Sequence, residues 1–322
     1  MPTRQRPFIG VDLGGTKIQV GVVDANNDIV GRARAKTRSE DGLETVIDRI
    51  AGVVHEAIEK AGLRAGDAGG LGIGAPGTVN VKKGIVLKAV NMRWDHVPLA
   101  ELLGKRVNMP VYVENDVNVG TWAEHVLGAG RQFDDLLGIF VGTGIGGGLV
   151  LNGELYQGGL MGAGEIGHTI IHADAPVGRQ TLENNASRTA VANLIAQLIQ
   201  SNHPSVVAEL TDGRLDEIRS KVLAKAIEQG DPMTCRVVRQ SARYVGVAVA
   251  NAVMLLSLPC IVVGGGLPEA LGEQYVKWVR TAFSRRVFTP EMQKCVVLLS
   301  QLGDDAGVYG AALLARKQLK KK

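Results

Sequence analysis

The chain has 322 residues, of which 45% are hydrophobic and 21% are charged, and its formal net charge is +4. A chain of this length and apolar content can bury a sizeable core, and we expect two domains. The basic residues are scattered except in the C-terminal tail, so we expect no nucleic-acid partner. The tail, which we expect to be solvated, contains Lys317, Lys320, Lys321 and Lys322.

The numbers of glycines and cysteines indicate the kind of turns to expect and the redox compartment of the protein. Glycine accounts for 42 residues, about 13% of the chain against a typical usage of roughly 7%, and predicts many tight turns. The three cysteines are far apart, follow no metal-binding spacing and have apolar neighbours, which predicts buried thiols in a reducing compartment. They are Cys235, Cys260 and Cys295.

One apolar segment is close to the length of a membrane span. Tyr244–Val263 contains no charged residue, but Pro259 interrupts it and "CIVVGGG" reads as a buried strand. A core helix followed by a strand is therefore the better interpretation. The N-terminal "MPTRQRPF" lacks the apolar region of a signal peptide. We expect a soluble, cytoplasmic protein without a membrane partner.

The N-terminal third begins with strands. Phe8–Asp12 and Ile18–Val23 predict two strands joined by a glycine turn, and Ile29–Thr37 predicts a third. A helix with one apolar face follows and ends at Gly62. The segments "GGLGIGAPG" and "VYVEND" then predict strands, the second leading into a helix. Their ranges are Gly69–Gly77 and Val111–Asp116, and the helix covers Val117–Val126.

The second half begins with the same order of elements. "LLGIFVGTGIGGGLVLNGELYQGG" reads as strand, glycine turn, strand, Asn-Gly turn and strand, which suggests two related halves that face each other. Helices then dominate, "CIVVGGGLPEAL" predicts strand, glycine turn and helix, and "DDAGVYGAALLARKQ" predicts a short C-terminal helix. The other expected helices are Ala190–Gln200, Leu215–Glu228 and Asp231–Ser257, the last opened by an Asp cap and a proline.

Three glycine turns are candidates for phosphate binding. "GGTK" lacks the spacer of a Walker loop, and "GTGIGG" matches the dinucleotide pattern but runs into a strand instead of the required helix. Each turn can still present backbone N–H groups to an anion without a Cβ in the way. A single such turn would read as an ordinary hairpin. Three of them, with an Asp or a Thr beside two, favour nucleotide phosphates.

The motif order "DLGGTK", "END", "GTGIGGG", "GEIGH" and "VVGGG" resembles that of the ROK family of sugar kinases, in the hexokinase and actin superfamily, over nearly the whole chain. The resemblance implies an α/β, two-domain actin-like ATPase fold with duplicated ribonuclease-H-like halves and an interdomain cleft. The small domain would cover residues 1–117 and the larger one residues 118–304, with a helix at 305–322 packing back on the first. A homodimer or a dimer of dimers is also implied.

The resemblance also assigns the residues that bind the implied cofactors, ATP and Mg²⁺. The first two glycine turns would hold the phosphates, and the third would flank the adenosine. Asp12 would supply an oxygen near Mg²⁺, directly or through water. The assigned residues are Gly14, Gly15, Thr16 and Lys17 in the first turn, Gly142, Thr143 and Gly144 in the second, and Gly264, Gly265 and Gly266 in the third.

Phosphoryl transfer to a sugar hydroxyl needs a base for the hydroxyl proton. Glu114 and Asp116 lie at the end of an apolar strand, where period-2 alternation would place both on one face and Asn115 on the other. The resemblance implies that Asp116 is the base and that Asn115 binds a sugar hydroxyl. The alternative is that Asp116 only caps the following helix.

Further sugar-binding residues are implied by "GEIGH" and "LENNAS". A carboxylate and an imidazole suit neighbouring hydroxyl groups, and Glu165 and His168 are three residues apart. The resemblance assigns both, together with Glu183, to the sugar. The alternative for each is an ordinary surface polar residue. The loop that begins at Gly74 is expected to line the sugar cleft with its backbone.

The chain departs from the family at its zinc motif. Family members typically follow Glu-x-Gly-His with a C-x-C-G-x-x-G-C cluster, but this interval contains no cysteine. Asp174, Pro176 and Thr181 occupy the cysteine positions. Because three of the usual four ligands are missing, we predict no zinc. The alternative is that His168, His172 and Asp174 retain a metal.

The leading hypothesis is ATP-dependent phosphorylation of a hexose at its 6-hydroxyl, with glucose converted to glucose 6-phosphate in glycolysis. Fructose, mannose and N-acetylhexosamines stay open as substrates, and polyphosphate stays open as a donor. A sugar-responsive transcriptional regulator is the alternative of another class. Only seven residues precede Phe8, against the roughly 60 to 80 that a winged-helix module needs, which disfavours DNA binding. The "GEIGH" segment disfavours an actin-like filament former.

Overall fold

The computed structural model describes residues 6–320 and divides the chain into two compact units. The first unit extends to Leu127 and also contains Leu155–Ala163 and the C-terminal segment from Asp304 onward. The second contains Gly128–Glu154 and Gly164–Gly303. The expected boundary at 117/118 would have assigned residues 118–127 and 155–163 to the second domain. Lys321 and Lys322 of the expected tail and helix lie outside the described residues.

A five-stranded mixed sheet forms the centre of the first unit, with the order β3-β2-β1-β4-β8. β1 is antiparallel to β2 and parallel to β4, so one side of the sheet is an antiparallel hairpin and the other side is parallel. The strands are β1 (Phe8–Leu13), β2 (Lys17–Val23), β3 (Ile29–Lys36), β4 (Leu71–Ala75) and β8 (Val111–Asn115).

One face of this sheet carries a conventional apolar core. Alternation along β1 puts Ile9, Val11 and Leu13 on this face, where all three are fully buried. The helices α1 (Leu43–Lys60) and α2 (Leu99–Val107) cover it with aliphatic side chains. The predicted helix that ends before Gly62 is therefore confirmed as α1.

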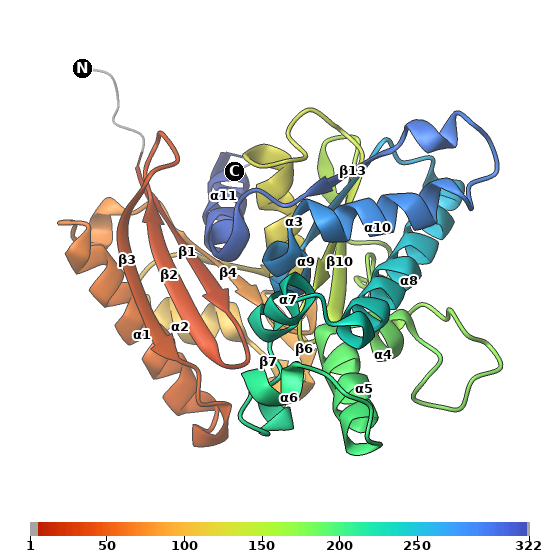
Figure 1. The fold of residues 1–322 in the computed structure, drawn as a ribbon. Helices are drawn as coiled ribbons and strands as arrows, with labels where there is room; N and C mark the ends of the chain where they lie inside the picture. The colour runs from red at the N-terminus through yellow and green to blue at the C-terminus, as the bar shows by residue number, and fades with distance from the viewer. Residues whose placement is uncertain (1–5, 321–322) are drawn as a thin grey trace. The chain divides into compact units, whose positions relative to one another are not determined.

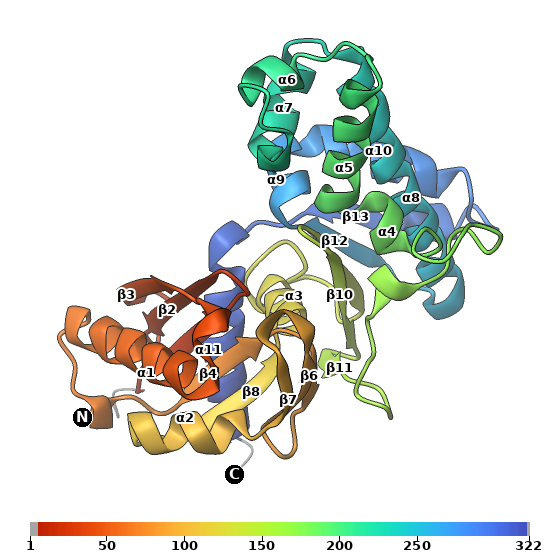
Figure 2. The same ribbon diagram turned by 90° about the horizontal axis from the view of Figure 1, so that it is seen from below.

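The opposite face is covered by α3 (Asp116–Val126) and α11 (Ala306–Lys320), with backbone in close approach (Figures 1 and 2). A Cβ added to Gly10 would lie 1.9 Å from the carbonyl oxygen of Val308, and one added to Gly72 would lie 1.8 Å from that of Ala311. No side chain larger than hydrogen fits at either position.

A small antiparallel sheet, β5-β6-β7, was not predicted. It lies between β4 and α2 in the sequence, and Val86, Met92 and Trp94 of this region are buried in the same apolar core as β1. Its strands are only three to five residues long, so their periodicity is weak. They are β5 (Thr78–Asn80), β6 (Ile85–Ala89) and β7 (Trp94–Val97).

The second unit repeats the topology of the first. The second five-stranded sheet has the order β11-β10-β9-β12-β13, again with an antiparallel hairpin followed by parallel strands, and of β11 only Glu154 falls within the second unit. The duplicated order confirms that the two halves are related in fold. The strands are β9 (Leu136–Val141), β10 (Ile145–Leu151), β11 (Glu154–Tyr156), β12 (Cys260–Gly264) and β13 (Val296–Leu299).

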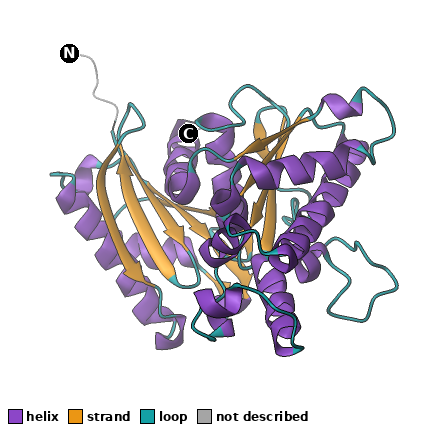
Figure 3. Cartoon of the chain, in the orientation of Figure 1, coloured by secondary structure: helices purple, strands orange, loops and turns teal. Residues whose placement is uncertain are grey.

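Helices supply most of the remaining second unit (Figure 3). In the uncharged segment Tyr244–Val263, the helix ends at Leu256 because the backbone of Ser257 is left-handed (φ 53°). The strand β12 then begins at Cys260. No helix among the described residues is long and apolar enough to cross a membrane. The helices are α4 (Leu182–Ala186), α5 (Arg188–Gln200), α6 (Val207–Leu210), α7 (Ser220–Glu228), α8 (Pro232–Leu256), α9 (Gly266–Leu271) and α10 (Glu273–Ser284).

The single helix expected over Leu215–Glu228 was wrong at its start. Leu215–Glu217 forms only a 3₁₀ turn, and the backbone is extended at Arg219 before α7 begins. Ile218, between the two, is 1% exposed. Burying this side chain redirects the backbone, which the helical period of the sequence did not indicate.

The contact between α11 and the sheet makes a testable prediction. Gly72→Ala should lower the free energy of unfolding by about 3 kcal/mol, because the added methyl overlaps a backbone carbonyl that cannot move alone. Gly52→Ala is the matched control. Gly52 lies within α1 with no atom within 4 Å of its added Cβ, so the change should stabilise by about 0.5–1 kcal/mol. Urea unfolding of both variants measures the difference, and equal stabilities would contradict the proposed close packing.

Candidate active site

The first glycine turn joins β1 to β2 in the first unit. The Gly14 N–H donates to the Lys17 carbonyl (2.9 Å), and the Thr37 hydroxyl donates to the Gly14 carbonyl (2.6 Å). Gly15 has no left-handed φ, and the nearest atom to a Cβ added there is 3.8 Å away. The turn therefore does not itself require glycine at this position. The open backbone at Gly15 and Thr16 can be approached closely by an external group.

Asp12 lies beside this turn, on the face of the sheet that α11 covers. A Cβ added to Gly307 of α11 would be 2.6 Å from the Asp12 carboxyl carbon. Burial raises the pKa of Asp12, while a hydrogen bond from Gln19 and the charge of Lys17 lower it. A carboxylate that burial destabilises gains from a nearby cation, so its oxygen chemistry fits Mg²⁺.

Asn115, not Asp116, caps α3. The Asn115 side-chain oxygen accepts from the backbone N–H groups of Val117 (2.9 Å) and Asn118 (3.0 Å). Its amide donates to the Gly77 carbonyl and to the Asp116 carboxylate, both at 3.0 Å. Asp116 is the first residue of α3 and lies at the positive end of the helix dipole.

Gly74 lies in β4 next to this helix start. A Cβ added to it would be 2.5 Å from the Val119 side chain and 3.2 Å from the Cα of Asp116. The fold thus brings three predicted residues together at the carboxyl ends of β4 and β8, because these parallel strands are neighbours. They are Gly74, Asn115 and Asp116.

Glu114 does not share a face with Asp116, so that expectation was wrong. The chain leaves the strand at Asn115 and turns into α3, which ends the period-2 alternation. Glu114 points inward and is 2% exposed. Its carboxylate accepts from the Asn115 N–H (2.9 Å), the Asn118 amide (3.1 Å) and the Gln157 amide. Burial raises its pKa, and these hydrogen bonds partly offset the rise.

The second glycine turn joins β9 to β10 in the second unit. Gly142 has no left-handed φ, and within the described chain no atom lies within 4 Å of a Cβ added to it. The Arg188 N–H donates to the Gly142 carbonyl (2.9 Å), and the Arg188 guanidinium donates to the Thr143 hydroxyl (2.9 Å). Burial and the nearby Arg219 lower the pKa of Arg188. An anion at this turn would relieve that repulsion.

Glu183 contacts the same turn. Its carboxylate accepts from the Ile145 N–H at 2.7 Å, and a Cβ added to Gly144 would be 2.2 Å from one of its oxygens. A side chain at Gly144 would therefore displace the Glu183 carboxylate from the turn. Glu183 thus binds the first residue of β10 and helps to hold the backbone of the turn in place.

Glu165 and His168 project from a loop that packs on β10. Gly164 has φ +90° and contacts the Gly147 backbone, and a Cβ added to Gly167 would be 2.0 Å from the Ile145 carbonyl. The glycines of "GEIGH" therefore allow the loop to pack closely. The Glu165 and His168 side chains are 51% and 70% exposed, and the Oε2 of Glu165 lies 3.9 Å from the Nε2 of His168.

The third glycine turn differs from the other two. Gly265 has φ +88°, and a Cβ there would be 2.7 Å from the Val141 backbone; one at Gly264 would be 2.8 Å from the Ser300 hydroxyl. These two glycines are thus explained by packing within the unit. Gly266 begins α9 with more space, its nearest neighbour being 3.4 Å away.

Main-chain hydrogen bonds hold the loop that lacks the cysteine cluster. Thr169–His172 pairs with Gln180–Leu182, and the Thr181 hydroxyl caps α4. The His172 ring contacts Tyr244 edge-on at 5.0 Å between centroids. Within residues 6–320, no group of three or more His, Cys, Asp or Glu is placed to hold a metal ion. The absence of zinc stays a prediction.

Sequence reasoning missed Arg188 and Gln157. Arg188 follows Ser187, the N-cap of α5, and only this local cap was visible in the sequence. Gln157 lies 43 residues from the glutamate it contacts, and no motif links the two.

Comparison with known proteins now identifies the family. The family model described as ROK family matches residues 8–318. The chain belongs to the ROK family. Its relatives include a glucokinase of Streptomyces coelicolor, 34% identical over 96% of this chain and 97% of that protein. A xylose repressor of Caldicellulosiruptor bescii is 28% identical over 94% of this chain and 76% of that protein.

A solved structure gives the same result for the fold. The ROK family glucokinase of Streptomyces griseus, crystallised with glucose and AMPPNP, is 36% identical to this ROK protein. The TM-score is 0.86, and the match covers 97% of this chain and 99% of that chain. The predicted actin-like α/β fold is therefore confirmed.

The buried carboxylate predicts a pH-dependent stability effect. Gln157→Ala removes a donor to Glu114 and should cost about 1–3 kcal/mol of unfolding free energy at pH 8. The pKa of Glu114 is raised on folding, so the folded state binds more protons and the carboxylate form costs stability as pH rises. The loss should therefore be smaller at pH 5 than at pH 8, because a larger fraction of Glu114 is protonated at the lower pH.

Chemical denaturation of the wild type and the variant at the two pH values measures this effect. Gln293→Ala, at an exposed position of the second unit, is the control and should show no such pH dependence. A loss of the same size at both pH values would contradict a role for the Glu114 carboxylate.

Proposed function

We propose that this ROK protein catalyses ATP-dependent phosphorylation of a hexose at its 6-hydroxyl, with glucose as the principal substrate. One observation carries the proposal. At the same hairpin of both duplicated sheets, a glycine stands where neither φ nor the chain's own packing requires it, namely Gly15 and Gly142. Such positions suit the close approach of phosphate groups to backbone N–H groups. The likeness to glucokinases supports the substrate assignment.

The chain's own groups fit a triphosphate. Backbone N–H groups of both turns would bind phosphate oxygens, and Lys17, Thr143 and Arg188 would add side-chain donors. Asp12 would hold Mg²⁺, and the turn that includes Gly266 would flank the adenosine. When bound, ATP supplies the phosphoryl group, and Mg²⁺ neutralises charge on its phosphates.

The proposed sugar site uses polar groups on short, fixed segments. Asp116, held at the start of α3, would accept the proton of the attacking hydroxyl. Asn115 uses its oxygen for the helix cap and its amide for the Gly77 carbonyl and the Asp116 carboxylate, so a sugar hydroxyl bound by Asn115 would replace one of the two amide contacts. Glu165 and His168 would bind neighbouring hydroxyls, and Glu183 would act on the sugar only through the loop it supports.

Asp116→Asn tests the proposed base. The variant should lose about 10²- to 10⁴-fold in kcat, because an amide cannot accept the hydroxyl proton. Thermal unfolding should change little, since an amide oxygen can still accept from the Val117 N–H. Asp216→Asn, at an exposed position of the second unit, is the matched control and should keep full activity. Activity near the wild-type level in Asp116→Asn would refute this role.

Arg188→Gln tests the second phosphate turn. Loss of one charge-assisted donor, worth about 1.5–3 kcal/mol, should raise the KM for ATP by about tenfold or more while the KM for glucose stays constant. Arg131→Gln, which changes an exposed arginine of the same unit, is the control. An unchanged KM for ATP would show that this guanidinium does not contact the phosphates.

A coupled assay of ADP release over a panel of hexoses, with ATP and Mg²⁺, tests the function as a whole. Fructose, mannose and N-acetylhexosamines are the alternative substrates, and polyphosphate is the alternative donor. We further propose a cytoplasmic, glycolytic role and a homodimer or dimer of dimers. The similarity to a xylose repressor keeps a regulator as the second candidate, favoured if no sugar is turned over.

A further inference from the structure

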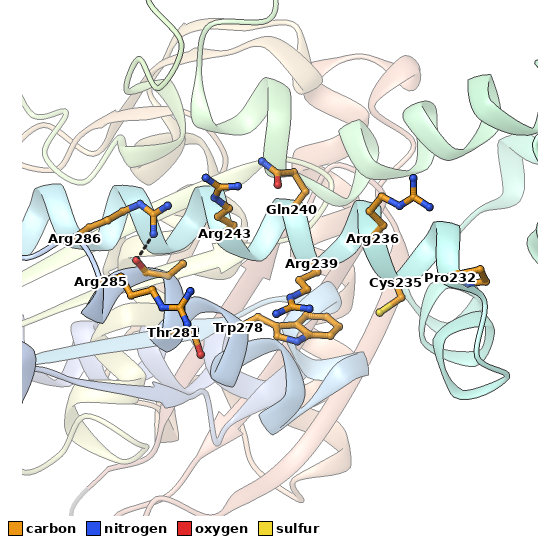
Figure 4. Close-up of a pocket in the computed structure, with 11 residues that line it drawn as sticks. Pro232, Cys235, Arg236, Arg239, Gln240, Arg243, Trp278, Thr281, Arg285 and Arg286 are labelled. Carbon is orange, nitrogen blue, oxygen red and sulfur yellow. Dashed lines mark hydrogen bonds between the residues drawn. The ribbon is translucent and has the colours of Figure 1, made fainter.

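A pocket of about 900 Å³ lies on the second unit, along the first half of α8 and the last half of α10 (Figure 4). Neither helix carries a residue proposed above for catalysis or substrate binding. Its walls are arginine-rich. They are formed by Pro232, Cys235, Arg236, Arg239, Gln240, Arg243, Trp278, Thr281, Ala282, Arg285 and Arg286.

The arginines arise from the helical period of α8. Arg236, Arg239 and Arg243 are spaced three and four residues apart, so they share one face of the helix. The intervening Val237 and Val238 are buried against the rest of the unit. The packing of α8 on its apolar side therefore turns all three guanidinium groups outward along the pocket.

The end of α10 adds two more cations. Arg285 follows the last residue of the helix, and the Arg286 guanidinium donates to the Ala282 carbonyl at 2.6 Å, which fixes its direction. α10 is held against α8 by a close contact, because a Cβ added to Gly246 would lie 2.6 Å from the Ala282 Cβ and from the Val279 carbonyl. The two rows of arginines are thus set by rigid helix packing.

No acidic side chain balances this charge. The pocket lining contains no Asp or Glu, and within residues 6–320 none of its five arginines forms an ion pair. Five guanidinium groups around one cavity repel one another, and an anion in the cavity would relieve that repulsion. Arginine is also the side chain best suited to phosphate, which it binds with two parallel hydrogen bonds.

The spacing of the arginines defines the shape of the anion. Arg236 and Arg243 are seven residues apart, which is about 10 Å along a helix that rises 1.5 Å per residue. A single phosphate would contact both ends of this row only if the Arg236 and Arg243 side chains converged, and in the structure they extend separately (Figure 4). A ligand with several phosphates in a line can contact both ends, and a pocket of this volume has the size of a small-molecule site.

We propose that this arginine pocket binds a linear oligophosphate, either a short inorganic polyphosphate or the phosphate chain of a nucleotide. The site is separate from the glycine turns and does not depend on the proposed kinase activity. Nucleic acid fits less well, because specific nucleic-acid interfaces bury on the order of 1,000 Å² of protein surface and use extended basic faces. The cations here are confined to one small cavity.

The test combines binding with a site-resolved readout on the full chain. Isothermal titration calorimetry with tripolyphosphate, ATP, orthophosphate and a short single-stranded oligonucleotide gives the affinities. Hydrogen exchange of peptides covering 232–243 and 278–286 reports the pocket separately from the glycine turns. The test variant is Arg236→Gln/Arg239→Gln/Arg243→Gln, since glutamine is a good helix former. Arg131→Gln/Lys225→Gln/Lys294→Gln, all at exposed positions of the second unit, is the control with the same change in net charge.

We expect tripolyphosphate or ATP to slow exchange in the pocket peptides and the test variant to weaken that binding at least tenfold. The control variant should bind as the wild type does, and both variants should keep the wild-type circular dichroism. Because ATP is also expected at the glycine turns, the ligand is assigned from the pocket peptides alone. Protection at lower concentrations of tripolyphosphate identifies an inorganic chain, and protection at lower concentrations of ATP identifies a nucleotide. Equal affinity in the test variant and the wild type, equally tight binding of orthophosphate, or tighter binding of the oligonucleotide would each overturn the proposal.

Discussion

The first unit depends on the direct contact between the backbone of α11 and the central sheet. Gly10 and Gly72 bring carbonyl groups of the helix so close to the strands that a methyl group would overlap them. On the helix itself, Gly310 allows the same closeness to α3. Contact at this distance replaces side-chain interdigitation with dispersion between main-chain atoms, so it requires glycine on one of the two surfaces at each contact. Five of the 42 glycines serve this packing, namely Gly10, Gly21, Gly72, Gly307 and Gly310.

This contact gives the two faces of the sheet different tasks. Large aliphatic residues under α1 and α2 supply the hydrophobic stabilisation. On the other face few side chains separate the sheet from the helices. There the end of β1 brings Asp12 against α11, and the ends of β4 and β8 bring Gly74 beside Asp116. Polar groups can be held rigidly at this face because backbone, which has few degrees of freedom, surrounds them.

The glycines of the chain therefore fall into two physical classes. At Gly72, Gly144 and Gly265, the chain's own atoms occupy the space of a side chain, and glycine is explained by packing. At Gly15 and Gly142, neither backbone conformation nor a neighbouring atom demands it. An unconstrained glycine does not by itself indicate a ligand, since Gly52 in α1 is equally free, but Gly15 and Gly142 occupy the matching hairpins of the two duplicated sheets. Because the two classes look alike in the sequence, only coordinates separate them.

The sequence by itself determined the family, the glycine turns and the hairpin strands of the two large sheets, because alternating apolar residues and glycine pairs produce the same local structure in most contexts. The short strands β5, β6 and β7 were not determined in this way. The sequence also located Asp116 and Asn115, whose motif is local. Tertiary structure decided what each polar group contacts: Glu114 with Gln157, and Glu183 with the second turn. These partners are 43 and 38 residues apart, and their pairing follows from how helices and strands pack, which no local pattern records. The spacing of the three arginines on α8 places them on one face of that helix. The cavity beside them exists only because α10 packs against α8.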